Sequence, residues 1–301
     1  MNTTTVTWPE LPFDAWADTY ETLHMWMQVV GKIKLALAPP LNEWWEVAFT
    51  MTAHGLTTGP IPFGERLFEI EFDFIEHQVH IRVSDGHSRN ILLIPRSVAT
   101  FYELLMDELE ELGLDCTIHT QPVECEIVTP YPEDHSHHSY DREYASRWWR
   151  ILVQLERLLQ TYRSDFLGKS SPILFFWGSF DMAHTRYAGR LTTMPEGANH
   201  MRRVGGDEEQ FEVGFWPGSG KLKAPAFFAY CLPRPDGAKE AAIQPATASY
   251  NGDLDEFILL YDDARNAASP DEAILSFFRS TYDACATLAG WDRAFLERKI
   301  R

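Results

Sequence analysis

One short stretch of this 301-residue chain places a carboxylate among aromatic residues. It reads Phe175-Phe-Trp-Gly-Ser-Phe-Asp181 and has the composition of a strand. Because side chains alternate between the faces of a strand, Trp177, Ser179 and Asp181 are expected on one face. A carboxylate on an apolar face costs free energy unless it is paired. The pattern predicts either a general acid/base at Asp181 with Ser179 and Trp177 binding substrate, or a structural carboxylate capped by amides and paired with Arg186.

Other candidates for the same site lie elsewhere in the chain. Glu209 is a second carboxylate suited to acid/base chemistry, and Arg186 or Lys32 would hold a substrate carboxylate or oxyanion. His24 and Lys32 lie eight residues apart on a predicted helix, so both project to nearly the same side. That stripe either binds an anionic group of a ligand or is a satisfied histidine beneath a surface lysine. Trp216 is expected in the aromatic wall of a pocket.

Familiar cofactor motifs do not explain the chain. Neither the HExxH nor the GxSxG pattern occurs, and two Gly-Lys turns lack the first glycine of a phosphate loop. The run His135-Ser-His-His138 has side chains that bind zinc or iron, but neighbouring side chains on a loop diverge. A solvated connector is therefore expected there. The sequence predicts no cofactor and no metal, and it favours hydrolysis, isomerisation or proton transfer.

Composition excludes several classes of protein. The 44 acidic residues outnumber the 26 Lys and Arg residues, which gives a net charge of −18 and argues against a nucleic-acid partner. No stretch approaches the roughly 18 consecutive apolar residues of a membrane span. The first eight residues lack the basic start and apolar core of a secretory signal. With four scattered cysteines, the sequence favours a reduced, cytoplasmic protein that binds a small molecule.

The chain is also predicted to repeat itself. A shift of 132 positions places Pro40 on Pro172 and Trp45 on Trp177, and further matches follow in the same order. Each copy reads as a helix, about four strands and a closing helix. This order predicts an α+β fold with antiparallel sheets, in which two copies pack about a pseudo-dyad and leave a cleft between them.

The predicted copies cover residues 1–120 and 143–301, and a connector at 121–142 joins them. Helical periodicity and end signals predict helices at 15–37, 97–112, 143–166 and 270–290. Short alternating runs predict strands at 44–52, 67–75, 78–83, 90–94, 173–187, 209–216, 225–232 and 256–261.

Several long, tryptophan-bearing motifs make the chain resemble a bacterial family catalogued as a domain of unknown function, number 5996. They are Leu23-His-Met-Trp26, Gly31-Lys32, Phe175 to Asp181, Tyr187-Ala-Gly-Arg190 and Gly214-Phe-Trp-Pro-Gly218. The resemblance runs from about Trp8 to about Trp291 and implies no known activity or cofactor. Relatives tend to carry Ser-His-Glu before the Phe-Trp-Pro-Gly motif, whereas this chain has Asp207-Glu-Glu209. The resemblance therefore leaves Glu209 available but no histidine beside it.

Two functions remain open from the sequence. The first is an enzyme that acts on a small organic molecule in an aromatic-lined cleft between the two halves, by carboxylate acid/base chemistry. The second is a non-catalytic protein that holds a ligand or peptide in the same cleft. Two or more titratable groups with shifted pKa values in the cleft would favour catalysis, and a dry aromatic groove would favour binding.

Overall fold

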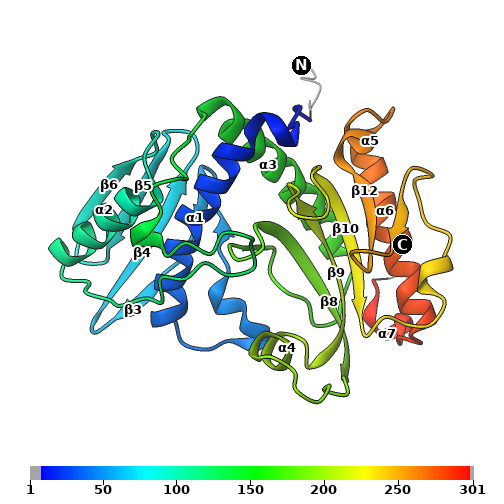
Figure 1. The fold of residues 1–301 in the computed structure, drawn as a ribbon. Coiled ribbons are helices and arrows are strands. Elements are labelled where there is room, and N and C mark those ends of the chain that lie inside the picture. The colour runs from blue at the N-terminus through cyan, green and yellow to red at the C-terminus, as the bar shows by residue number, and fades with distance from the viewer. Residues whose placement is uncertain (1–7, 299–301) are drawn as a thin grey trace, which may run out of the picture.

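A computed structural model describes residues 8–298 and contains two six-stranded antiparallel sheets with helices packed against them (Figure 1). The predicted α+β class is therefore confirmed. None of the described helices has both the length and the apolar composition to cross a membrane. Residues 1–7, on which most of the argument about a secretory signal depends, lie outside the described part.

The first half builds its sheet between two long helices. Helix α1 ends shortly before two consecutive prolines, and the Ser97 side chain caps α2 by accepting a hydrogen bond from the amide of Thr100. The strand order is β1-β2-β4-β5-β6, and β3 also pairs with β4. The elements are α1 (Phe13–Leu37), the 3-10 helix η1 (Asn42–Val47), β1 (Thr50–Met51), β2 (Gly55–Thr57), β3 (Ile61–Phe63), β4 (Arg66–Asp73), β5 (Gln78–Val83), β6 (Ser88–Leu92) and α2 (Val98–Glu111).

The second half follows a connector that contains η2 (Tyr131–Glu133). Its strand order is β11-β12-β10-β9-β8-β7, and α6 packs against β9, β10 and β12. The elements are α3 (Arg142–Ser164), β7 (Leu174–Phe176), β8 (Asp181–Leu191), α4 (His200–Gly205), β9 (Glu208–Trp216), β10 (Ala226–Leu232), η3 (Ala238–Glu240), β11 (Ser249–Asn251), β12 (Glu256–Leu260), α5 (Tyr261–Arg265), α6 (Pro270–Leu288) and α7 (Arg293–Leu296).

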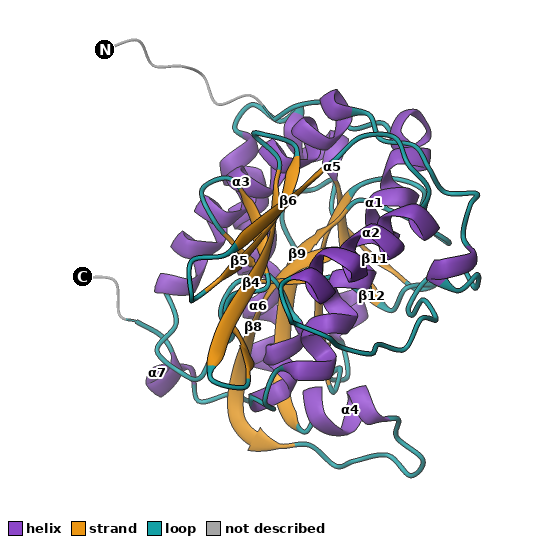
Figure 2. Ribbon diagram, turned by 90° about the vertical axis from the view of Figure 1, so that its left-hand side faces the viewer, coloured by secondary structure: helices purple, strands orange, loops and turns teal. Residues whose placement is uncertain are grey.

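The two sheets meet where β1 lies beside β7. Phe49 and Phe175 form an antiparallel bridge there and exchange two backbone hydrogen bonds of 2.8 and 2.9 Å. Helices α1 and α3 also pack together, with the rings of Trp16 and Trp148 6.3 Å apart. The side view in Figure 2 shows the strands near the centre of the molecule with helices to either side. One continuous hydrophobic core therefore spans both halves.

Two predicted strands are wrong in part. Residues 42–47 form a 3-10 helix in which Glu43 and Trp44 have φ values of 47° and 64°, so strand β1 begins only at Thr50. The predicted strand at 173–187 is interrupted after Phe176, because the chain turns back and Phe176 pairs with Asp181. Phe180 has a φ of 62° in this turn. The expected shared strand face of Trp177, Ser179 and Asp181 therefore does not exist.

The internal duplication stays a prediction. Both halves order their main strands as antiparallel neighbours between a first and a closing helix. A two-fold axis through the bridge between the sheets would relate Phe49 to Phe175, whereas the shift of 132 positions relates Phe49 to Asp181. Superposition of residues 14–113 on 143–290 is the test of the repeat and of its register.

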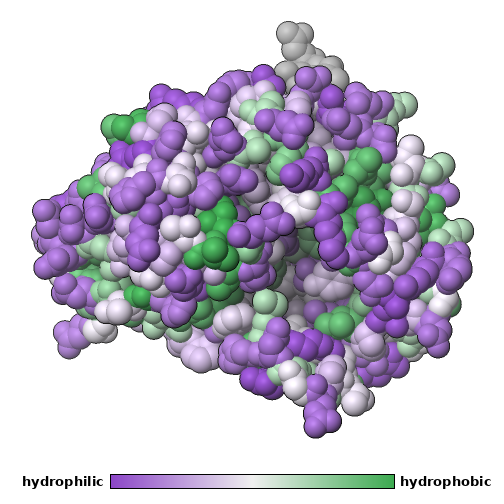
Figure 3. All heavy atoms as spheres, in the orientation of Figure 1, coloured by the Kyte–Doolittle hydropathy of each residue, from purple (hydrophilic) through white to green (hydrophobic). Residues whose placement is uncertain are grey.

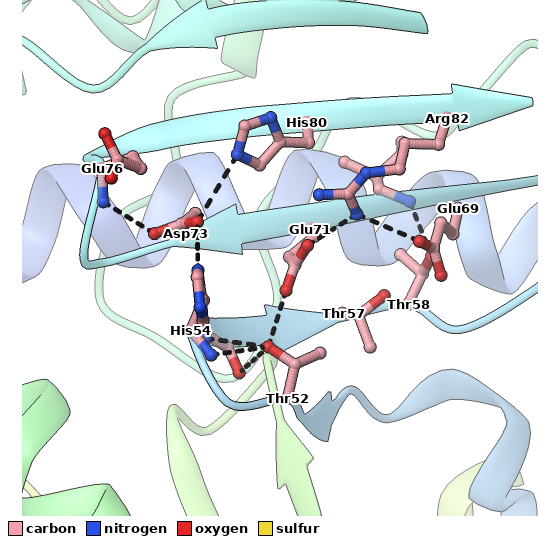
Figure 4. A network of polar contacts seen from close by, with 12 residues as sticks. Thr52, His54, Thr57, Thr58, Glu69, Glu71, Asp73, Glu76, His80 and Arg82 are labelled. Atoms are coloured by element: carbon pink, nitrogen blue, oxygen red, sulfur yellow. Dashed lines mark hydrogen bonds and ion pairs between the residues drawn. The ribbon is translucent and has the colours of Figure 1, made fainter. Parts of the chain in front are cut away.

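The first sheet turns a polar face away from the core. Strands β4 and β5 alternate, so that Phe68, Ile70 and Phe72 are buried in the core while Glu71 and Asp73 face the other way. Figure 4 shows how these carboxylates are paired. Glu71 accepts hydrogen bonds from Thr52 and Arg82, each of 2.6 Å, and His54 lies 3.1 Å from Asp73. Charge on this sheet is therefore locally compensated.

Candidate functional site

The corresponding face of the second sheet forms the floor of a cavity of about 780 Å³. Figure 3 shows that the molecule is hollowed near the middle of this face, between the part formed by α1 and the part formed by β8 to β10. Helix α1 and η1 contribute Lys32, Trp44, Trp45 and Val47, and the connector contributes Glu124. The remaining walls come from the β7–β8 turn, α4, β8, β9, β10 and β12. Both halves of the chain therefore contribute to one cavity.

Strand alternation determines which side chains reach the cavity floor. On β9, Phe211, Val213 and Phe215 belong to the core, so Gln210 and Glu212 face the cavity. The register places Thr185 of β8 and Tyr230 of β10 on either side of Glu212. Strand β8 also contributes Asp181, β9 contributes Trp216, β10 contributes Phe228 and β12 contributes Glu256. Carboxyl, hydroxyl and aromatic groups from four neighbouring strands therefore share one surface.

Three carboxyl groups on this floor have raised pKa values. Burial raises the pKa of Asp181 well above its ordinary range, and the nearby Glu212 raises it further, although the Ser179 hydroxyl donates a hydrogen bond to this carboxyl. Burial also raises the pKa of Glu212, which accepts hydrogen bonds from Thr185 (2.7 Å) and Tyr230 (3.0 Å). Burial and the charge of Glu212 raise the pKa of Glu256 to about 7. Asp181 therefore holds its proton to a higher pH than an ordinary carboxyl group, and Glu256 is close to half ionised near pH 7.

The wall above the floor is Trp177, which the first half holds in place. Its indole Nε1 donates a 2.6 Å hydrogen bond to the carbonyl oxygen of Val47. Its ring lies so close to Gly31 of α1 that a Cβ atom there would overlap it, so only glycine permits this contact. His24 Nε2 donates to the carbonyl oxygens of Trp177 (3.1 Å) and Gly178 (2.9 Å). The turn that carries Trp177 is therefore clamped by α1 and η1.

A further carboxylate of the cavity, Glu124 of the connector, packs against this turn. Gly178 has Glu124 Oε1 so near that a Cβ atom would collide with it. Burial raises the pKa of Glu124, and the opposing effect of Lys32 is smaller. Burial in turn lowers the pKa of Lys32, whose Nζ lies 5.9 Å from the Trp177 ring centroid. Lys32 and Glu124 together line the side of the cavity next to α1.

The structure brings five of the eight sequence candidates together. The cavity is lined by Lys32, Trp177, Ser179, Asp181 and Trp216. His24 lies behind the wall: it is fully buried, burial lowers its pKa to about 4, and its Nε2 contacts two backbone carbonyls and the side chain of Gln28. Glu209 faces away from the cavity and forms a 2.6 Å ion pair with Arg190. His24 and Glu209 therefore do not line the cavity.

Arg186 lies on the opposite face of β8 from Asp181. The two residues are five apart on one strand, so alternation separates them. The guanidinium stacks on the rings of Tyr162 (3.6 Å from Cζ to centroid) and Tyr282 (4.5 Å), and it donates to the Tyr162 carbonyl. The expected pairing of Arg186 with Asp181 is wrong, because the strand does not bend between them.

The position of Arg186 predicts a structural effect. Replacing Arg186 by alanine is expected to lower the free energy of unfolding by about 3 kcal/mol, because a cavity forms and the stacking on aromatic rings is lost. Urea unfolding monitored by circular dichroism measures this loss. Ligand binding in the cavity is expected to be unchanged at a temperature at which the variant is folded. A variant of normal stability that no longer binds ligand would contradict this structural role.

Sequence reasoning missed Glu212, Glu256, Glu124 and Tyr230. For Glu212 the signal was available, because alternation over 209–216 separates Gln210, Glu212, Gly214 and Trp216 from the apolar residues between them. Glu256 gave no such signal, since it is simply the first residue of β12. Glu124 lies in the irregular connector, where no periodicity places a side chain.

The histidine run in the connector has other contacts. His137 Nδ1 lies 2.7 Å from Asp134 Oδ2, and Asp134 Oδ1 accepts hydrogen bonds from the amides of Ser136 and His137. Within residues 8–298, no group of three or more His, Cys, Asp or Glu side chains is arranged to hold a metal ion. These contacts make the segment a local turn built around Asp134.

Comparison with known proteins agrees with the motif resemblance. One family profile, described as "Family of unknown function (DUF5996)", matches residues 8–298. No curated protein and no solved structure matches the chain. The match covers nearly the whole chain, and its description assigns no activity.

Proposed function

Since the chain belongs to DUF5996, a family without an assigned activity, we propose a function from its own residues: an enzyme that transfers protons to and from a small organic molecule bound in the cavity. The observation that carries this proposal is that two carboxyl groups on one cavity floor both have raised pKa values. The pKa of Asp181 lies well above its ordinary range, and that of Glu256 is about 7. Titratable groups with strongly shifted pKa values that share a cavity are typical of acid/base sites.

Each group has a defined part in the proposed reaction. Asp181 donates a proton to the substrate, and Ser179 orients its carboxyl group. Glu256 accepts a proton, because a base is most effective when its pKa lies near the working pH. Trp177 and Trp216 hold the flat part of the substrate. Glu212, fixed by Thr185 and Tyr230, supplies negative charge that helps to raise the pKa values of both groups.

The free cysteines and the net charge support a cellular compartment and a class of substrate for the proposed enzyme. All four cysteines are free thiols, which supports a cytoplasmic protein in a reducing compartment. The net charge of −18 supports a small-molecule substrate rather than a nucleic acid.

The experiment for proton transfer works even when the product is not identified. The protein is incubated in D2O with a panel of small amines, amides, esters and hydroxyketones, and proton NMR follows conversion or deuterium uptake. We expect at least one compound to react, with a rate that rises as the pH increases through about 7 and Glu256 ionises. Asp181→Asn and Glu256→Gln should each lower that rate by about 100-fold or more.

The matched control is Glu209→Gln, which removes a carboxylate outside the cavity and should leave the rate unchanged. Saturable binding without conversion of any compound would favour the non-catalytic binding protein instead. Retention of the full rate in both cavity variants would rule out these two residues as the acid and the base.

A further inference from the structure

The charge of the cavity floor points to the chemical class of its ligand. In the described part of the chain, Asp181, Glu212 and Glu256 form no ion pair, whereas the carboxylates on the outer face of the first sheet are paired. Buried carboxyl groups without a cation are costly in their ionised form. A positively charged ligand would remove this cost, so the floor is complementary to a cation.

A second observation concerns a neutral group on the same floor. Gln210 is 6% exposed and lines the cavity, and its Oε1 has no hydrogen-bond partner among the described residues. A buried acceptor of this kind requires a donor. Gln210 and Glu212 are two residues apart on β9, so they project from the same face towards the same space. A ligand that donates hydrogen bonds would satisfy Gln210 and Glu212 together.

The walls complete the match to an organic cation. Trp177, Trp216 and Phe228 present aromatic rings to the cavity, and such rings attract organic cations and pack against flat apolar groups. Within residues 8–298, the carboxyl groups do not converge as metal ligands do. The cavity of about 780 Å³ is also far larger than a single ion requires.

We infer that the ligand of this cavity carries a primary ammonium or guanidinium group, which binds Glu212, Asp181 and Gln210, joined to an apolar, flat body held by the aromatic walls. The inference rests on the proposed function only in using the same cavity. Binding of the cation favours the ionised form of the carboxyl groups, so the ligand is expected to release protons as it binds.

Other charged and titratable groups also face the cavity and affect how ligand affinity depends on pH. Three basic side chains line the side of the cavity that lies opposite the floor: Lys32 on α1, and His200 and Arg202 on α4. The remaining groups are Glu43, Glu124, Tyr187 and Tyr230. Glu43 is already paired with Lys169. An anionic ligand would have to use the three basic side chains and would leave the floor uncompensated.

Three probes of similar size and different charge test the inference: 2-phenylethylammonium, 2-phenylethanol and phenylacetate. Their binding to the full chain is measured by titration calorimetry at pH 6 and pH 8. We expect the ammonium to bind at least tenfold more tightly than the alcohol at pH 8, and phenylacetate to bind most weakly. Of the three probes, only the ammonium should bind more tightly at pH 8 than at pH 6. The reason is that Glu256, which shares the cavity floor with the binding groups, ionises over this range and adds negative charge to the floor.

Two variants locate the effect. Glu212→Gln removes the charge but keeps the shape of the side chain and one of its two accepting oxygens, and it should lower ammonium affinity about tenfold with no change for the alcohol. Gln210→Leu should also weaken the ammonium, while Glu209→Gln serves as the control outside the cavity. Equal binding of the three probes, tighter binding of phenylacetate, or no binding of any probe would overturn the inference.

These outcomes are separable from those of the proposed function. Tight, Glu212-dependent ammonium binding without conversion of any compound would sustain the inference and contradict the proposed catalysis. Glu256-dependent conversion of a neutral or anionic compound, with no preference for the ammonium, would do the reverse.

Discussion

Replacing Gly31 by alanine is expected to lower the free energy of unfolding by about 1–3 kcal/mol and to weaken ligand binding, because the new methyl group overlaps the Trp177 ring. Helix propensity alone would give the opposite sign, since alanine in a helix is favoured over glycine by about 1 kcal/mol. The clash dominates because Trp177 cannot easily move. Its indole donates a hydrogen bond to the carbonyl of Val47, and its own carbonyl accepts one from His24. Urea unfolding measures the loss of stability, and the change in tryptophan fluorescence on adding ligand measures the loss of binding.

The matched control for stability is Gly205→Ala. Gly205 is also helical, but a Cβ atom there would lie 3.5 Å from its nearest neighbour, the carbonyl oxygen of Glu43, which is ordinary contact. An increase in stability of Gly31→Ala, or the same change in both variants, would show that Trp177 does not pack on Gly31 as described.

Replacing Glu256 by glutamine is expected to stabilise the protein at pH 8 while it removes the proposed activity. The pKa of this carboxyl is near 4.5 in the unfolded chain and about 7 in the folded chain. Between these values the unfolded chain ionises first, so wild-type stability decreases as the pH rises from about 4.5 to 7. Glutamine does not ionise, so the variant escapes this loss. Because the side chain is partly accessible, we expect a gain of about 1–2 kcal/mol at pH 8.

Urea unfolding of wild type and variant at pH 5 and pH 8 checks the sign. The difference between them should grow from pH 5 to pH 8. A variant whose relative stability falls as the pH rises would mean that Glu256 is a paired structural carboxylate. A stabilising substitution that destroys activity is typical of residues kept for function.

The four long helices could be predicted from the sequence because their signals are local. Helix α1 is expected at 15–37 and occupies 13–37, and the cap at Ser97 has the expected hydrogen bond to Thr100. Periodicity and capping depend only on neighbouring residues. The predicted boundaries of these two helices therefore agree with the structure to within about two residues.

The broken strands could not be predicted, because distant contacts determine them. Glu43 takes a positive φ within η1 and forms an ion pair with Lys169, more than a hundred residues away. The turn at Trp177 depends on Val47 and His24 of the other half. Local propensity favours a strand in both segments, and tertiary contacts override it.

The candidate site could be predicted in part, although the expected strand face on which that prediction was based does not exist. Asp181 departs from the apolar pattern of its segment, and it does line the cavity, although no shared strand face exists. Pairing it with Arg186 assumes a bend that the strand does not make. The groups that share the cavity floor with Asp181 are instead Glu212 and Glu256, two further carboxyl groups on β9 and β12 that raise its pKa. Only the folded sheet brings these carboxyl groups together.

The bridge between Phe49 and Phe175 bears on the order in which the chain folds. Most strand pairs within each sheet join neighbours in sequence, so their loops are short and close at small entropic cost. The bridge closes a much longer loop, so its entropic cost is larger and we expect it to form after the short-range strand pairs. Trp177 reaches Gly31 and Val47 across this same junction. We therefore expect the binding site to assemble late in folding, and a ligand to stabilise only chains in which the two halves have docked.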